Sequence, residues 1–137
     1  MDIQFTESDE KRMRSIGVVA AYLFGSRAVG REGPNSDFDF AFLMDRAGYR
    51  RGGDAHAALY DLVTPHCKRA SLENDVIDIV FLNDAPLELR SHVVRHGKLI
   101  FDDKPVDRAR YEQKTMLLAA DFRPVLDEVD QTILASL

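Results

Sequence analysis

Three aspartates lie in or beside segments that would otherwise be buried strands. Asp37 and Asp39 open the apolar segment 37–44, and Asp78 lies within the segment 75–82, the most β-rich stretch of the chain. Because side chains alternate between the faces of a strand, Asp37 and Asp39 share one face. An isolated buried carboxylate costs several kcal/mol unless a partner or a metal compensates it. These acids therefore need a positive partner.

A divalent cation would compensate all three carboxylates at once. No Lys or Arg lies in the core of either segment to neutralise them. Mg²⁺ prefers oxygen ligands, binds one or two carboxylates and completes its shell with water and phosphate oxygens. The pattern therefore predicts a magnesium site that receives a phosphate-bearing ligand.

A short loop rich in Gly, Pro and Ser, residues 25–36, comes directly before Asp37. Gly25 allows the backbone to approach an anion closely, and Ser26 follows it. The combination of Gly-Ser, ten residues and then Asp-x-Asp is far more specific than either part. The loop is not a Walker A loop, because Arg-Glu follows its second glycine. The sequence also lacks the G-x-G-x-x-G motif of a Rossmann dinucleotide site.

The hydrophobic pattern predicts an α/β fold in which helices pack on a small mixed sheet of about four strands. The expected elements are a helix from Thr6 to about Gly17, strands at 18–24 and 37–44, a helix at 54–69 that Pro65 interrupts, a strand at 75–82, a helix at 86–96, a strand at 99–101, and helices from Val106 that break before Pro124. We expect one domain, 1–137, in which the C-terminal helical segment from about residue 105 is a candidate for partner docking.

The composition limits the classes of function. Eighteen Lys and Arg against 23 Asp and Glu give a net charge of −5, which disfavours a dedicated nucleic-acid binder. A single cysteine, Cys67, excludes an internal disulfide framework and a Cys-rich zinc module. The longest apolar run, 16–24, is too short to span a bilayer, and the N-terminus lacks the layout of a signal peptide. We therefore expect a cytoplasmic protein with no membrane partner and no direct binding of nucleic acid.

Other polar residues are open to two interpretations. His92 and His96 lie four apart on one helix face and could bind metal, but a solvated or partner-facing patch is expected without a third ligand. The basic residues of the stretch 46–70 are expected to form a solvated face, with contact to a nucleotide or partner as the alternative. Asp78 itself could instead pair with an Arg that is distant in the sequence.

The residues around the loop resemble the signature of a known superfamily. Residues 23–30 (LFGSRAVG) and 35–40 (NSDFDF) are similar to the nucleotidyltransferases with the DNA polymerase β-type palm. The short chain and residues 77–83 (IDIVFLN) and 97–101 (GKLIF) resemble the minimal nucleotidyltransferase (MNT) family. The resemblance covers about residues 8–110.

The resemblance implies transfer of a nucleoside monophosphate from a nucleoside triphosphate to a hydroxyl, with pyrophosphate leaving. Asp37 and Asp39 would hold two Mg²⁺ ions, which lie about 3.5–4 Å apart in such sites. Asp78 would complete the metal site and orient or deprotonate the attacking hydroxyl. The residues that would bind the nucleotide are Gly25, Ser26 and Arg27. Catalysis in such a site is mainly positioning and charge neutralisation.

Small MNT proteins are similar to the antitoxins of HEPN–MNT toxin–antitoxin pairs, in which the MNT protein modifies a tyrosine of the HEPN ribonuclease toxin with AMP. The resemblance thus implies an adenylyltransferase that uses ATP and forms a hetero-oligomeric complex with a cognate HEPN toxin. Two alternatives stay open. One is a non-catalytic antitoxin that binds its toxin through the C-terminal helices, and the other is a nucleotidyltransferase acting on a small molecule such as an aminoglycoside. The sequence contains no base-reading motif and does not fix how many nucleotides are added.

Overall fold

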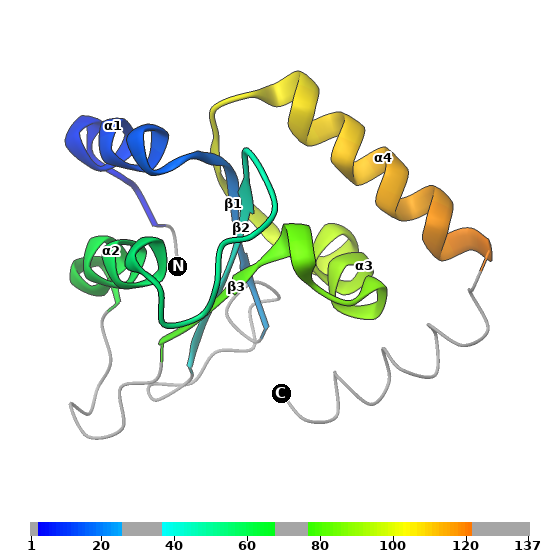
Figure 1. Ribbon diagram of the computed structural model, residues 1–137, viewed down its shortest axis with the longest axis horizontal. Helices are drawn as coiled ribbons and strands as arrows, with labels where there is room; N and C mark the ends of the chain where they lie inside the picture. Colours follow the sequence, from blue (N-terminus) through cyan, green and yellow to red (C-terminus); the bar gives the residue numbers. More distant parts are fainter. Residues whose placement is uncertain (1–2, 26–36, 68–76, 122–137) are drawn as a thin grey trace.

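A mixed sheet of four strands, in the order β3-β2-β1-β4, separates two pairs of helices in the computed structural model, which describes residues 3–25, 37–67 and 77–121. The elements are α1 (Glu7–Ile16), β1 (Val18–Phe24), β2 (Phe38–Met44), α2 (Asp54–Val63), η1 (Thr64–His66), β3 (Ile77–Phe81), η2 (Leu82–Asp84), α3 (Leu87–His96), β4 (Lys98–Asp102) and α4 (Pro105–Asp121). β1 pairs antiparallel with β2 and β4, and β2 pairs parallel with β3. Figure 1 shows α1 and α2 on one face of the sheet and α3 and α4 on the other.

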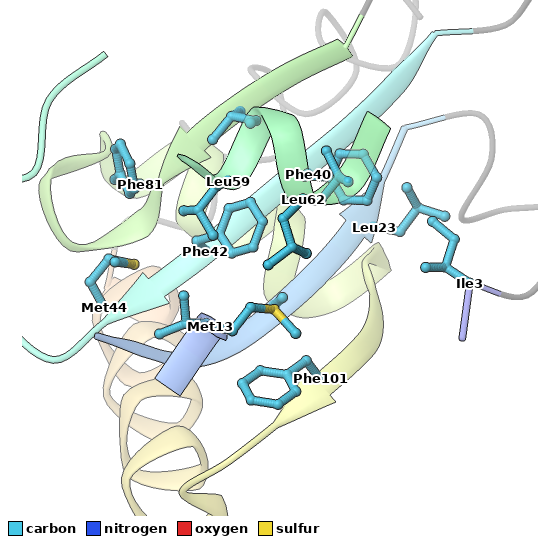
Figure 2. Close-up of a cluster of buried hydrophobic side chains, with 14 of the residues drawn as sticks. Ile3, Met13, Leu23, Phe40, Phe42, Met44, Leu59, Leu62, Phe81 and Phe101 are labelled. Atoms are coloured by element: carbon cyan, nitrogen blue, oxygen red, sulfur yellow. The ribbon is translucent and has the colours of Figure 1, made fainter. Parts of the chain in front are cut away.

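Both faces of the sheet are covered, so its central strands are apolar on both sides. Every residue of β1 is buried, as expected for a strand between two helical layers. Phe38, Phe40 and Phe42 point to the face covered by α1 and α2, where Figure 2 shows Phe40 and Phe42 among Leu59, Leu62 and Met13. Ala41 and Leu43 pack on the opposite face with Val93 of α3. The predicted alternation of the second strand is confirmed.

The ends of the helices follow their local sequence. Thr6 caps α1: its side chain accepts a hydrogen bond from the Asp9 amide (3.0 Å), and the Asp9 carboxylate accepts one from the Thr6 amide (3.0 Å). This reciprocal pair satisfies two amides that the first turn leaves without partners. α2 ends at Val63, directly before the 3₁₀ turn that contains Pro65, so the predicted interruption is confirmed.

Several predicted boundaries differ from the structure, among them those of the third strand and of the last described helix. The third strand begins at Ile77 among the described residues and ends at Phe81, because residues 82–84 turn into the 3₁₀ segment η2. The last described helix runs from Pro105 to Asp121. The predicted break before Pro124 and the helix after it lie outside the described residues. None of the helices in the described ranges has the length and apolar character that crossing a membrane requires.

A polar network attaches α4 to the sheet. The buried Tyr22 hydroxyl of β1 donates to Glu112 Oε2 (2.7 Å). Arg108 donates to the same carboxylate (2.9 Å) and to Asp102 at the end of β4 (2.9 Å). Burial and the charge of Glu112 raise the pKa of Tyr22 above its ordinary value, so the hydroxyl stays a donor. The network fixes α4 against β1 and β4.

We expect Tyr22→Phe to lower the free energy of unfolding by about 1–2 kcal/mol, because a buried hydrogen bond to a carboxylate is lost while the aromatic packing remains. Urea unfolding measures the effect. The matched control is Tyr60→Phe on the outer side of α2, where the side chain is exposed, and its change should stay within about 0.5 kcal/mol. Equal effects of the two substitutions would contradict the assigned network.

Candidate active site

Asp39 and Asp78 are neighbours on the parallel strands β2 and β3. The register pairs Asp39 with Asp78, and each is the second residue of its strand. The residues on either side of them, Phe38, Phe40, Ile77 and Ile79, pack into or against the core between the sheet and α1–α2. The two carboxylates therefore lie on the opposite face, at the end of the sheet where β2 and β3 begin.

The environment of Asp39 disfavours its negative charge. Its side chain is half-buried, and burial, followed by the charges of Asp78 and Asp37, raises its pKa from 3.8 to about 6. Asp37 lies directly before β2 and is exposed. Three acids that repel one another at one place create a negative potential that a cation would relieve.

Gly25 directly follows the last residue of β1 and lies next to Asp39. The register pairs Phe24 with Asp39 across the antiparallel β1–β2 ladder, which brings the following residue against this carboxylate. Gly25 has φ of +81°, and a Cβ atom placed on it would lie only 2.5 Å from Asp39 Oδ2. The backbone thus approaches the acid more closely than any other residue type would allow. Ser26 and Arg27, the other two residues expected to bind the nucleotide, lie outside the described residues.

Asp78 differs from the expectation. Its Oδ1 atom accepts a hydrogen bond from Arg51 Nη2 at 2.8 Å, and its side chain is 32% exposed. The expectation of a carboxylate embedded in the core without a basic neighbour is therefore wrong, because Asp78 pairs with an Arg. The physical reason is that β3 forms the edge of the described sheet. No described strand pairs with the outer edge of β3, so Arg51, from the segment between β2 and α2, can reach Asp78 there. The role of Asp78 at a metal site stays a prediction.

This ion pair also affects how the acids are arranged. Within the described ranges, no three Asp, Glu, His or Cys side chains are grouped so that they could hold one metal ion. Arg51 partly neutralises Asp78. Metal binding by all three aspartates would require Asp78 to exchange Arg51 for the ion.

The comparison with known families decides the class of protein. Residues 10–106 match the family described as Polymerase beta, Nucleotidyltransferase. The chain belongs to this nucleotidyltransferase family. Its four-stranded mixed sheet, covered by helices on both faces, confirms the fold predicted from the sequence.

Relatives of this nucleotidyltransferase include a curated protein and solved structures. It is 30% identical over 105 residues to the protein adenylyltransferase MntA of Aphanizomenon flos-aquae, an alignment that covers 75% of this chain and 69% of that protein. It is 28% identical to a chain of a toxin–antitoxin crystal structure with AMP-PNP, with a TM-score of 0.57 and coverage of 87% and 93%. A mutant MntA–HpeT toxin–antitoxin structure matches at 26% identity, with a TM-score of 0.55 and the same coverages.

Two features of this nucleotidyltransferase were not predicted from its sequence. Arg51 belongs to a basic stretch that was expected to be mainly solvated, and spacing alone does not distinguish it from Arg46 or Arg50.

His92 was expected on a solvated patch, but it is 1% exposed and lies against His96 with ring centroids 5.1 Å apart. Burial, then the charges of His96 and Arg95, lower the pKa of His92, which favours its neutral form. The interpretation of His92 as a surface residue is wrong, because its side chain is almost completely enclosed by the fold.

Proposed function

We propose that this chain is a Mg²⁺-dependent protein adenylyltransferase and antitoxin, which transfers AMP from ATP to a tyrosine hydroxyl of a cognate HEPN toxin. The observation that carries this proposal is the pairing of Asp39 with Asp78 beside the close approach of Gly25, in a chain of the nucleotidyltransferase family. The name of the curated relative supports the adenylyl group. The complex with AMP-PNP, an ATP analogue, supports ATP as donor and a toxin as partner.

The residues present fit Mg²⁺. The candidate ligands are carboxylate oxygens, which this hard cation prefers. Burial, followed by the charges of Asp78 and Asp37, raises the pKa of Asp39, and a bound cation would offset both effects. In the proposed site Asp37 and Asp39 would hold two ions, and Asp78 would complete the set once the acceptor displaces Arg51. The bound ions would neutralise the triphosphate and make the acceptor hydroxyl easier to deprotonate.

Phosphate binding and proton transfer are assigned to residues of the chain. The backbone at Gly25 and the side chains of Ser26 and Arg27 hold the β- and γ-phosphates. Asp78 takes the proton of the tyrosine hydroxyl, whose oxygen forms a new bond to the α-phosphorus. The bond from this phosphorus to the pyrophosphate oxygen breaks in line, and pyrophosphate leaves with the electron pair. The product is a tyrosine that carries AMP through a phosphodiester bond.

The position of the label in ATP tests the proposal. The full chain is incubated with its purified HEPN partner, Mg²⁺ and ATP labelled in either the α- or the γ-phosphate. We expect only the α-label to appear on the toxin, and to appear on tyrosine. When EDTA is present from the start, no label should be transferred. Transfer of the γ-label would indicate a kinase, and the absence of both labels from the toxin would overturn the proposal.

A non-catalytic antitoxin is the second candidate. The observation in its favour is the apolar surface of α4, where Leu117 is 65% exposed and Leu118 is 36% exposed. If binding alone silences the toxin, Asp37→Ala expressed at the wild-type level should still protect cells that carry the toxin. If catalysis is required, we expect this variant to lose protection while still co-purifying with the toxin.

A further inference from the structure

A pocket of about 240 Å³ lies along β3, and its lining on this strand begins one residue after Asp78, at Ile79. Its walls are mainly apolar and include the rings of Tyr49 and Phe81 and the side chains of Val80, Ala85 and Leu89. Arg51 lines the same pocket. The pocket thus combines an aromatic and aliphatic lining with one cationic residue, Arg51, and one acidic residue, Asp84.

The walls of the pocket are fixed by their own contacts. The Tyr49 hydroxyl lies 3.1 Å from both the Ile16 carbonyl oxygen and the Asp45 carboxylate, and its ring centroid is 5.7 Å from that of Phe81. Asp84 accepts a hydrogen bond from the Gly48 amide (3.0 Å), which ties η2 to the segment after β2. These contacts hold the walls of the pocket in place.

Arg51 connects the pocket to the acids. The same guanidinium that lines the pocket donates to Asp78 Oδ1 at 2.8 Å. Its side chain is 75% exposed, so it can leave Asp78 without disturbing buried packing. Arg51 therefore occupies one of the two oxygens of the carboxylate to which an acceptor in the pocket would bring its hydroxyl.

The order of groups across the sheet indicates what the pocket binds. From β1 outward come Gly25, then Asp39 on β2, then Asp78 on β3, and finally the pocket beyond the edge. In an in-line displacement the attacking and leaving oxygens lie on opposite sides of the phosphorus. If the β- and γ-phosphates are held at the β1 side, the acceptor must approach from the β3 side.

We propose that this pocket is the acceptor subsite and receives the phenol ring of a tyrosine of the partner polypeptide, with Arg51 as the positioning residue at its mouth. The inference rests on the proposed function and assigns its acceptor site. Entry of the ring brings the phenol hydroxyl to Asp78, which exchanges Arg51 for this hydroxyl and accepts its proton. Until then Arg51 holds Asp78 and keeps it from activating water.

Binding of a small acceptor localises the subsite directly. Methyl resonances of the full chain are followed by NMR, with Mg²⁺ and a non-hydrolysable ATP analogue present, as N-acetyl-tyrosinamide is added to millimolar concentration. We expect shifts at the methyl groups of Val80, Ala85 and Leu89 and none at Leu62 or Val63 on the opposite face. Absence of the expected shifts overturns the inference. So does a shift of the same methyl groups by the ATP analogue alone, which would make the pocket a nucleobase site.

Filling the pocket tests its role in the reaction. We expect Ala85→Phe to raise the KM for the toxin about tenfold or more, with the KM for ATP unchanged, since a ring placed in the pocket competes with the acceptor. Ala85→Ser is the matched control and should retain both constants. If the wild type transfers no AMP, the proposed function fails. If the wild type is active and Ala85→Phe has the wild-type KM for the toxin, only the acceptor subsite fails.

The role of Arg51 has a separate readout. Without toxin, we expect Arg51→Gln to hydrolyse ATP to AMP and pyrophosphate severalfold faster than the wild type, because the released Asp78 can accept a proton from water. Arg50→Gln removes the same charge from the same segment and should leave this rate unchanged. A rate in Arg51→Gln no higher than that in Arg50→Gln overturns the assignment of Arg51.

Discussion

Asp39→Asn is expected to reduce AMP transfer by about a thousandfold or more, because an amide cannot supply the charge that holds divalent ions at the reacting phosphate. The same substitution should stabilise the metal-free chain at neutral pH. The reason is that Asp39 is half-buried beside two other acids and its pKa is raised to about 6. A residue that weakens the fold and yet enables the reaction would show these two effects together.

The stabilising effect of Asp39→Asn should depend on pH. A carboxyl whose pKa rises from 3.8 to about 6 on folding favours the folded state when protonated. This contribution is complete below pH 3.8 and is lost as the pH rises through about 6. Because Asn is neutral throughout, its advantage should be small at acidic pH and reach about 1–2 kcal/mol at neutral pH, after allowance for solvent screening.

Urea unfolding in EDTA at acidic and neutral pH measures this difference, and the labelled transfer assay measures the catalytic loss. Asp61→Asn on α2 is the control, because its side chain is exposed and lies outside the acid cluster. It should change neither property appreciably. Transfer by Asp39→Asn at the wild-type rate would exclude the assigned role of Asp39, and a stability difference independent of pH would contradict the raised pKa.

Gly25→Ala is expected to reduce transfer by about a hundredfold or more and to lower the free energy of unfolding by about 2–3 kcal/mol. Two effects combine at this position. The backbone has φ of +81°, which an L-residue with a side chain adopts at a cost, and the new Cβ would lie 2.5 Å from Asp39 Oδ2. Relief of this clash would require Asp39 or the end of β1 to move.

Gly48→Ala separates the two effects. Gly48 has a similar backbone, with φ of +103°, but a Cβ there would have no atom within 4 Å. We expect this control to lose about 1 kcal/mol of stability through backbone strain alone and to retain the wild-type transfer rate. If Gly25→Ala and Gly48→Ala behave alike in both assays, the close approach of Gly25 to Asp39 has no functional importance.

The spacing of apolar residues and the positions of Gly and Pro predicted those parts of the fold that depend on residues close together in the sequence. The alternation of side chains predicted that Phe38, Phe40 and Phe42 lie on one face of the sheet. The continuous apolar sequence of β1 predicted a strand that is buried on both faces. The breaks at Gly17 and Pro65 follow from backbone preferences that act within a few residues.

The features that sequence reasoning missed depend on contacts between distant segments. Arg51 and Asp78 are 27 residues apart and meet only because the segment after β2 folds over the edge of the sheet. His92 is 1% exposed, and this burial depends on packing around α3 that its own segment does not encode. Neither contact leaves a periodic signal, because loop conformation and helix packing are set by the whole fold. The positions of Ser26 and Arg27 remain predictions.

The order of the strands has a consequence for amide hydrogen exchange. β1 lies between two antiparallel partners and is buried along its whole length, so its amides should exchange only on global unfolding. β3 has five residues and one described partner strand, and it can open locally at a lower free energy. The third acid, Asp78, thus lies on an edge strand of the described sheet. Ligands shared between Asp39 and Asp78 would cross-link that strand to the centre of the sheet, and filling of the site would be visible as slower exchange along β3.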